Sequence, residues 1–403
     1  FRASIYAFDL VQKRAKRPAG APDKALAKKI TKVGIIGAGL MASQFALLFV
    51  RRLKVPVVIT DLDQTRVDKG LSYITEEIDK LAAKGRISAD ETNRLKALIS
   101  GTTDKKDFAD ADWIIEAVFE EVGVKQQVFA DVEQYAADDA IFATNTSSLS
   151  VAEIGSKLKH PERVVGFHFF NPVAVMPLIE VVKTSKTTDE ALSTAMVTAQ
   201  ALRKNAVITT DTPGFVVNRI LAKLLGEAMS AVENGTKPET VVEAVRPFGL
   251  PMDPFALMEL VGLQIGAHVL HTHHAAFPER FQASAALDEL AEYGHLLEKD
   301  SKGKVKGYDP KALAIIKKHQ VAGSTGMTAE ALRQRVEDGL ADEIHRMLDE
   351  HVVEAAEDID LCLILGAGWP FQMGGVTPYL DRVGASQRVF ADTFHHPMIV
   401  GVK

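Results

Sequence analysis

The feature that most constrains the fold is a glycine turn set between a short apolar run and a stretch of helical apolar spacing. Residues 32–36 form a β-rich run, residues 37–39 turn out of it, and residues 40–52 carry apolar side chains at helical intervals. A second β-rich run, residues 55–61, follows and ends in an acid. Strand, turn, helix and strand in this order predict a β-α-β unit and therefore a parallel sheet.

The turn has the spacing of a dinucleotide-binding motif, GAGLMA at residues 37–42. Gly37 permits the tight turn, Gly39 lets the backbone approach a pyrophosphate, and the final alanine is small enough for helix–strand packing. Asp61 lies 22 residues after Gly39, where an acid can hydrogen-bond a ribose 2′-hydroxyl. Because a carboxylate repels a 2′-phosphate, the motif favours NAD over NADP, although Arg66 stands close enough to accept such a phosphate. A purely structural glycine turn is the alternative.

Along the rest of the chain, strand signals give way to helix signals. Continuous apolar runs predict further buried strands, and one long helical stretch is predicted at residues 64–99. After Asp211 the pattern is helical. The predicted fold class is an α/β Rossmann-like NAD-binding domain followed by an all-α, duplicated C-terminal domain. The further strands are predicted at residues 113–118, 140–144, 164–168 and 206–209.

The predicted duplication depends on two segments of the helical part, residues 241–262 and 359–384. In each segment a helix ends at a Gly-x-Pro element, and a second helix ending in Val-Gly follows after a loop. The alternative is that the two segments resemble each other by chance, because many helix–turn–helix segments end their helices with similar residues. The predicted domains are a linker at 1–29, the Rossmann domain at 30–210, a first helical domain at 211–320 and its second repeat at 321–403.

Charge and composition exclude several classes of protein. The formal net charge is −6, so the chain has no large basic excess with which to neutralise nucleic-acid phosphates. Basic residues do cluster at positions 13–17 and 24–29, a pattern that we interpret as a solvated helix or linker. No stretch reaches the ~18 apolar residues of a membrane span. No secretory signal opens the sequence.

A second group of polar residues indicates a site for proton transfer. His168 and Glu180 are twelve residues apart in the apolar run GFHFFNPVAVMPLIE, and a histidine with a nearby carboxylate can move a proton near neutral pH. Ser147 and His168 lie at the ends of predicted strands, where ligands of a doubly wound sheet bind. Asn171 follows the histidine, and Asn218 lies at the start of the first helix of the helical part. Structural roles are the alternatives: a helix cap for the serine, a core histidine, a surface ion pair for the glutamate and a hydrogen bond at the domain junction for Asn218.

Together these elements resemble the L-3-hydroxyacyl-CoA dehydrogenase family. The matching motifs are GAGLMA, EAVFEEVGVKQQVF, NTSSLS, GFHFFNPV with LIEVVKT, and DTPGFVVNR, in the family's order and spacing across about residues 30–262. The helical repeat and the segment EKDSKGKVKGYD resemble, more narrowly, the dehydrogenase portion of the multifunctional fatty-acid oxidation protein, the trifunctional enzyme α subunit. Residues 1–29 resemble the linker of that family, which implies an enoyl-CoA hydratase domain N-terminal to this portion in the full-length chain.

The resemblance implies NAD-dependent oxidation of (S)-3-hydroxyacyl-CoA to 3-ketoacyl-CoA in fatty-acid β-oxidation, with an acyl-CoA substrate and no metal. It implies that His168 is the general acid/base and that Glu180 orients its imidazole. Ser147 and Asn218 would hydrogen-bond the substrate oxygen, with Asn171 as a further substrate contact. The residues implied at the cofactor are Gly37, Gly39, Leu40, Met41, Asp61, Glu120 and Lys125.

The resemblance also implies partners and a compartment, and it leaves two other functions open. A thiolase subunit or a second copy of this chain is the implied partner, and the bacterial cytoplasm is the implied compartment, with the mitochondrial matrix as the alternative. The other functions are a catalytically silent NAD-binding structural or assembly subunit, and a dehydrogenase of another acid such as a sugar acid. The joint presence of Ser147, His168, Glu180 and Asn218 argues against the first, and the HFFNP and DTPGF elements argue against the second.

Overall fold

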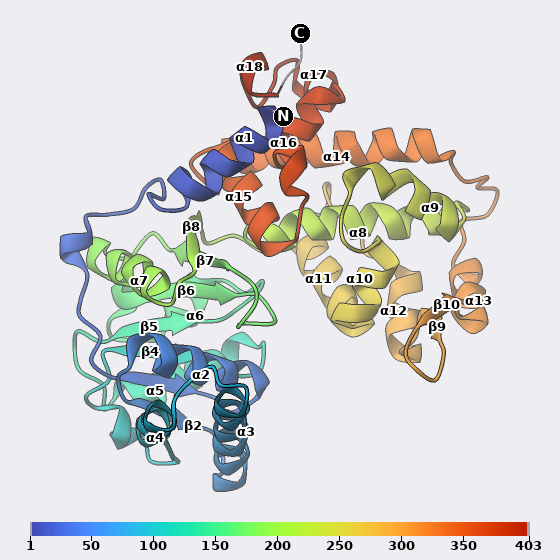
Figure 1. Ribbon diagram of the computed structural model, residues 1–403. Helices are drawn as coiled ribbons and strands as arrows, with labels where there is room; N and C mark the ends of the chain where they lie inside the picture. The colour runs from blue at the N-terminus through green and yellow to red at the C-terminus, as the bar shows by residue number, and fades with distance from the viewer. Residues whose placement is uncertain (1, 401–403) are drawn as a thin grey trace. The chain divides into compact units, whose positions relative to one another are not determined.

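The chain folds into two compact units, one built on a sheet and one built of helices. A computed structural model describes residues 2–400 (Figure 1). The sheet unit is Arg14–Phe215, and the helical unit combines the chain from Val216 onward with the described part of residues 1–13. The segment predicted as a linker, residues 1–29, is therefore divided between the two units. No helix within residues 2–400 is both long and apolar enough to cross a membrane.

An eight-stranded sheet forms the centre of the sheet unit, with the strand order β3-β2-β1-β4-β5-β6-β7-β8. Strands β1 to β6 run parallel to one another. Strands β1, β2, β4, β5 and β6 are buried at every residue, as the apolar runs predicted, whereas the edge strand β3 is only half-buried. The bounds are β1 Val33–Ile36, β2 Val57–Thr60, β3 Ile99–Thr102, β4 Trp113–Glu116, β5 Ile141–Thr144, β6 Val164–Phe169, β7 Leu178–Lys183 and β8 Asn205–Thr210.

Helices cover both faces of this sheet, and two separate apolar cores result. On one face Ile115 of β4 packs in a cluster that includes residues of α2, α3 and α7. On the other face its neighbour Ile114 packs in a cluster with α5 and α6, because successive side chains of a strand point to opposite faces. The helices are α2 Leu40–Leu53, α3 Gln64–Ala83, α4 Ala89–Ala97, α5 Val122–Glu133, α6 Val151–Gly155 and α7 Asp189–Ala201.

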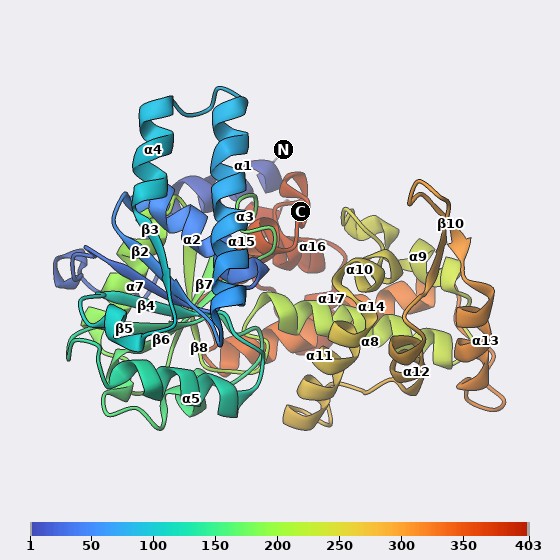
Figure 2. The same ribbon diagram turned by 90° about the horizontal axis from the view of Figure 1, so that it is seen from below.

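The single helical stretch predicted at residues 64–99 is wrong, because two helices and the start of a strand occupy it. Helix α3 ends before Gly85, which adopts φ +65°, a conformation that glycine tolerates and that stops a helix. Helix α4 then begins after its N-cap residue Ser88, whose hydroxyl accepts a hydrogen bond from the Glu91 amide. The two helices stand side by side as a hairpin (Figure 2).

One strand pair breaks the parallel pattern that the sequence predicted. Strand β7 runs antiparallel to β6, with His168 directly opposite Glu180, and β8 runs parallel to β7. The connection from β6 to β7 is residues 170–177, which is shorter than the dozen or so residues that a parallel crossover requires. The short connection therefore forces the chain to turn back beside the strand it has just left.

The C-terminal unit is helical, as predicted, and it contains one hairpin that the sequence did not predict. Strands β9 (Leu297–Lys299) and β10 (Val305–Tyr308) form an antiparallel hairpin. Asp300 stabilises its turn by accepting hydrogen bonds from the amides of Lys302 and Lys304. The hairpin was missed because its exposed strands are rich in lysine and glycine, which are uncommon in strands.

The N-terminal segment contributes the first helix of this unit. The bounds of its α-helices are given next. They are α1 Arg2–Asp9, α8 Val217–Glu233, α9 Pro238–Val245, α10 Pro254–Val261, α11 Leu263–Ala276, α12 Ala285–Tyr293, α13 Pro310–Lys318, α14 Ala329–Asp349, α15 Ala356–Gly366, α16 Val376–Arg382, α17 Ala385–Phe390 and α18 Pro397–Val400.

The two segments predicted as a repeat meet at their equivalent turns. Gly249 follows the 3₁₀ turn after α9, Gly368 lies two residues after α15, and their φ angles are +66° and +70°. A Cβ atom added at Gly249 would lie 2.9 Å from Cγ of Pro370, and one added at Gly368 would lie 3.2 Å from Cγ of Pro251. Each glycine therefore makes room for the proline of the other copy, and the contact is reciprocal.

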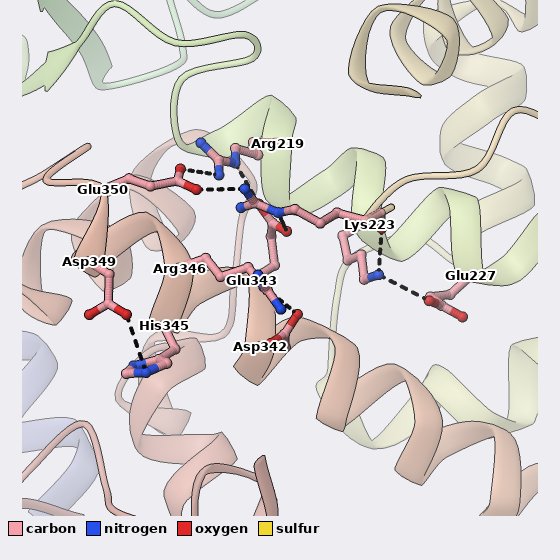
Figure 3. A network of polar contacts seen from close by, with 10 residues as sticks. Arg219, Lys223, Glu227, Asp342, Glu343, His345, Arg346, Asp349 and Glu350 are labelled. Carbon is pink, nitrogen blue, oxygen red and sulfur yellow. Dashed lines mark hydrogen bonds and ion pairs between the residues drawn. The ribbon is translucent and has the colours of Figure 1, made fainter. Parts of the chain in front are cut away.

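A buried network of charges joins the first helix of the helical part to its second half (Figure 3). Arg219 of α8 and Glu343 of α14 are both fully buried, and Nε of the arginine donates to the carboxylate at 2.6 Å. Arg280 bonds the same carboxylate at 2.6 Å, and Glu350 accepts from both guanidinium groups at 2.6 Å. The ring of Phe277 lies 4.5 and 4.6 Å from the two guanidinium carbons. Each buried charge thus has an opposite charge in contact.

We expect Glu343→Gln to destabilise the helical unit by about 3–5 kcal/mol, because it leaves the buried Arg219 guanidinium with one carboxylate fewer. Chemical denaturation followed by circular dichroism measures this loss. Asp342→Asn is the matched control on the same helix: its partner Arg346 is 49% exposed, and the pair should contribute no more than about 1 kcal/mol. Equal effects of the two substitutions would contradict the role of the buried network.

Candidate active site

The glycine turn predicted from the sequence has the geometry of a nucleotide cradle. Gly37 adopts φ +112°, and a Cβ there would lie 2.8 Å from the carbonyl oxygen of Ala117. Gly39 stands at the N-terminus of α2, and a Cβ there would meet no atom within 4 Å. The protein itself therefore does not require a glycine at position 39, whereas a ligand that approaches the backbone at the helix N-terminus would. Ala42 is fully buried, as its packing role predicted.

Asp61 follows β2 and faces this turn. Its carboxylate accepts hydrogen bonds from the amides of Ala38 and Leu62, each at 2.7 Å. A cavity of about 520 Å³ is lined by the turn, by Asp61 and by α3. Arg66 also lines the cavity, but its guanidinium lies 3.4 Å from Asp63 and 3.9 Å from Asp61. These two carboxylates offset the positive charge of Arg66, which a 2′-phosphate would need for binding.

His168 and Glu180 form a buried pair on neighbouring antiparallel strands. Nδ1 of His168 lies 2.7 Å from Oε2 of Glu180. The glutamate is fully buried and the histidine is 6% exposed. The rings of Phe170 and Phe215 lie 4.6 and 5.8 Å from the imidazole. Because Nδ1 is engaged by the carboxylate, Nε2 is the nitrogen that can exchange a proton with a ligand.

Ser147 lies after β5 and is held by Glu120. The same carboxylate oxygen of Glu120 accepts from the Ser147 amide at 2.8 Å, from the Thr146 hydroxyl at 2.6 Å and from the Ser147 hydroxyl at 3.3 Å. The structure does not make this serine the cap of the next helix, because Ser150 caps α6. Glu120 therefore sets the position of the serine.

Lys125 holds Glu120 in turn, through a chain of buried charges. Its ammonium group is fully buried, donates to both oxygens of Glu116 at 2.9 Å and lies 3.2 Å from Glu120. Burial disfavours the charged lysine, but Glu116 and Glu120 outweigh this effect and raise its pKa. Burial likewise opposes ionisation of Glu120, but Lys125 and the bonds from Thr146 and Ser147 hold its pKa below the ordinary value. Both groups therefore stay charged through the neutral range.

Two further side chains anchor the loops around this site. Asn145 accepts a hydrogen bond from the Phe169 amide at 2.9 Å, which joins the ends of β5 and β6. Asp211, the acid of the DTPGF element, accepts from the Ser150 hydroxyl and from the amides of Val151 and Ala152, at 2.8–2.9 Å. It thereby caps the N-terminus of α6.

Asn171 and Asn218 complete the set of predicted site residues. Asn171 is exposed in the turn that follows β6. Asn218 is half-buried in the first turn of α8 and belongs to the helical unit. Leu40 and Met41, predicted at the cofactor, begin α2 directly after the turn, and Leu40 is 57% exposed. The roles of these four residues stay predictions.

Sequence reasoning missed several residues of this region. Glu116 is the hub that holds Lys125, and it also accepts from the Thr144 hydroxyl and the Val118 amide. The signal was present, since an acid in the apolar run WIIEAV is as unexpected as Glu180 in its own run. Leu62 and Phe119, 81% and 76% exposed, are large apolar side chains next to Asp61 and Glu120. No sequence pattern distinguishes them from core residues.

We expect Lys125→Met to destabilise the sheet unit by about 3–5 kcal/mol, because it leaves Glu116 buried without its counter-ion. The double variant Glu116→Gln, Lys125→Met should recover part of this loss, since it removes both charges. Denaturant unfolding measures both. Lys157→Met, at an exposed lysine of the same unit, is the control and should change stability by no more than about 0.5 kcal/mol. A double variant as unstable as the sum of its single variants would refute the pairing.

Comparison with known proteins gives two family models that match consecutive parts of the chain. The model described as "3-hydroxyacyl-CoA dehydrogenase, NAD binding domain" matches residues 32–212, and "3-hydroxyacyl-CoA dehydrogenase, C-terminal domain" matches residues 214–307. The chain is 33% identical over 383 residues to the fatty acid oxidation complex subunit alpha of Shewanella putrefaciens, covering 93% of this chain and 54% of that protein. The chain thus spans about half the length of that relative.

Solved structures agree with these matches. FadB2 of M. tuberculosis is 34% identical, with a TM-score of 0.62, covering 66% of this chain and 95% of that one. The 3-hydroxybutyryl-CoA dehydrogenase of Escherichia coli K12 is 23% identical, with a TM-score of 0.75, covering 92% of this chain and 97% of that one, and shows the same fold. The nucleotide cradle, the buried imidazole–carboxylate pair and these matches together show that the chain belongs to the 3-hydroxyacyl-CoA dehydrogenase family, whose first domain binds NAD.

Proposed function

We propose that this chain oxidises (S)-3-hydroxyacyl-CoA to 3-ketoacyl-CoA with NAD, in fatty-acid β-oxidation. The observation that carries the proposal is the 2.7 Å contact between Nδ1 of His168 and the fully buried carboxylate of Glu180. A buried carboxylate orients the imidazole and stabilises its protonated form, which is what a general base for an alcohol requires. The family membership supplies the class of substrate.

The residues of the glycine turn fit NAD. Gly37 and Gly39 would admit the pyrophosphate to the helix N-terminus, and Asp61 would accept a hydrogen bond from a ribose hydroxyl. The exposed side chains of Leu40 and Leu62 offer apolar surface beside the turn. When bound, NAD supplies the acceptor for the hydride that leaves the substrate carbon.

The remaining work falls to side chains of this chain. Nε2 of His168 would take the proton of the substrate 3-hydroxyl, while Glu180 holds the resulting imidazolium in place. Ser147 would hydrogen-bond the same substrate oxygen, at a position set by Glu120. Asn218 and Asn171 are proposed as further contacts to the substrate.

The partners and the compartment are proposals as well. The Shewanella relative is named as a subunit of a fatty acid oxidation complex, which supports assembly of this chain into a complex. The partners that we propose for it are an enoyl-CoA hydratase domain and a thiolase subunit. The bacterial cytoplasm is the proposed location, with the mitochondrial matrix as the alternative.

We expect His168→Gln to lower turnover of acetoacetyl-CoA with NADH by about 10²–10⁴-fold, because the reaction loses its positioned proton donor. The affinity for NADH should stay within about twofold of the parent, since the histidine acts on the substrate. The loss of absorbance at ~340 nm measures turnover, and fluorescence titration measures NADH binding.

The chain offers a matched control for this test. His160 lies 3.1 Å from Glu162, and both side chains are 40% exposed. His160→Gln therefore removes a histidine–glutamate pair at the surface and should leave turnover unchanged. Turnover by His168→Gln at the parental rate would exclude the proposed role of His168, whereas a parent that does not turn over acetoacetyl-CoA would favour a catalytically silent NAD-binding subunit.

A second test concerns the choice of cofactor. Asp61→Asn removes the charge that binds a ribose hydroxyl, so NADH binding should weaken by about 10–100-fold. The preference for NADH over NADPH should narrow as well, because the repulsion of a 2′-phosphate is lost. Titrations with both nucleotides measure this change. Asp68→Asn, at an exposed position on α3, is the control. An unchanged ratio of the two affinities would place the ribose elsewhere.

A further inference from the structure

The sheet unit contains a second cavity, apart from the nucleotide cradle. It has a volume of about 370 Å³ and lies between the segment of residues 15–24 and the junction of α7 with β8. This volume falls within the range of small-molecule pockets. The segment is the basic stretch that the sequence indicated only as a solvated linker, and the proposed reaction uses none of its residues.

The cavity carries an excess of positive charge. Lys16, Arg17, Lys24 and Lys204 line it, whereas the only acid in its lining is Asp23. The Asp23 carboxylate already accepts from the Ala25 amide at 2.9 Å, as the cap of a short 3₁₀ turn. The Lys24 ammonium contacts a neutral acceptor, the Gln200 side chain, at 3.0 Å. The lining therefore holds more cationic than anionic groups.

Lys204 is held in place by two backbone carbonyl groups. It is half-buried, and its ammonium donates to the backbone carbonyls of Val173 and Met176 at 2.5 and 2.6 Å. Within residues 2–400 no ion pair joins it to a carboxylate. Burial and the charge of Arg52 lower its pKa to about 8. The charged form of Lys204 thus lacks a counter-ion, and a bound anion would stabilise it.

The cations continue beyond the cavity along the end of α2. Burial lowers the pKa of Arg52, and the charges of Arg203 and Arg51 lower it further. These arginines likewise form no ion pair in the described part of the chain. Arg52 therefore repels Arg51, Arg203 and Lys204, and the repulsion would be relieved by a ligand with more than one negative charge.

The other walls of the cavity are apolar, with Pro18, Pro22 and Met196 among them. Multiple cations beside apolar walls match an organic phosphate, whose phosphates meet the cations while its organic part covers the apolar surface. We propose that this cavity binds an organic polyphosphate or bisphosphate, such as the phosphorylated adenosine end of coenzyme A, at a site separate from the nucleotide cradle.

Isothermal titration with adenosine 3′,5′-bisphosphate tests the proposal, with the whole chain and saturating NAD to occupy the cradle. We expect one further binding site, whose affinity falls by about 10–100-fold in Lys204→Met and in Lys24→Gln. Lys157→Gln, which removes an equal charge in the turn after α6 at the other face of the sheet, should leave it unchanged. Adenosine without phosphate should not bind. Coenzyme A is titrated as a second probe, in order to distinguish coenzyme A from free nucleotides as the source of the bound phosphates.

Dependence on pH gives an independent readout. The ionisable groups around Lys204 are Lys16, Arg17, Asp23 and Lys24 from the segment of residues 15–24, and Arg51, Arg52 and Arg203 from the ends of α2 and α7. Lys204 loses its proton as the pH rises through about 8. Affinity should therefore fall by about tenfold over this range in the parent and stay constant in Lys204→Met.

The proposal fails if no site beyond the cradle is detected in the presence of NAD. It also fails if Lys204→Met and Lys24→Gln bind the bisphosphate as tightly as Lys157→Gln does, since binding would then lie elsewhere on the surface. Folding of each variant is checked by its circular dichroism spectrum. If Lys204→Met does not fold, Lys24→Gln decides the outcome alone, because Lys24 is exposed.

Discussion

The antiparallel pairing of β6 with β7 is the constraint on which the candidate active site depends. Its register places His168 directly opposite Glu180, and the two side chains meet at 2.7 Å inside the sheet unit. If the pairing slipped by one residue, the glutamate would point to the other face of the sheet, because side chains alternate along a strand. The short connection between the strands prevents a parallel crossover. Backbone topology thus decides the geometry of the acid–base pair.

Both units contain buried charges, and in each unit a buried cation is neutralised by two carboxylates. Lys125 lies between Glu116 and Glu120 in the sheet unit, and Arg219 lies between Glu343 and Glu350 in the helical unit. Removing one member of such a set leaves a charge in a medium that solvates it poorly. Both sets lie next to residues proposed to act on substrate, Ser147 and Asn218. Charge pairing therefore holds polar groups at defined positions within an apolar interior.

Much of the sheet unit was predictable because its signals are local. The glycine turn and most of the apolar strands follow from spacing alone, and the structure confirms them, whereas strand β7 was not predicted. The errors arose where a local pattern is weak. The edge strand β3 and the lysine-rich hairpin of β9 and β10 lack buried faces, and the break at Gly85 depends on one left-handed residue. The cluster around Ser147 forms only when three elements pack together, so the sequence did not predict Glu116, which holds Lys125 in that cluster.

The sequence by itself determined the class of fold, the cofactor and the residue types of the candidate site, because strand periodicity, turn chemistry and the glycine motif act over short stretches of chain. Only the tertiary structure decided that β7 runs antiparallel, that Glu120 holds Ser147, and that the basic segment of residues 15–24 closes a cavity with Lys204. These contacts join residues far apart in the chain. Their geometry depends on how whole elements pack, and one-dimensional spacing does not encode that packing.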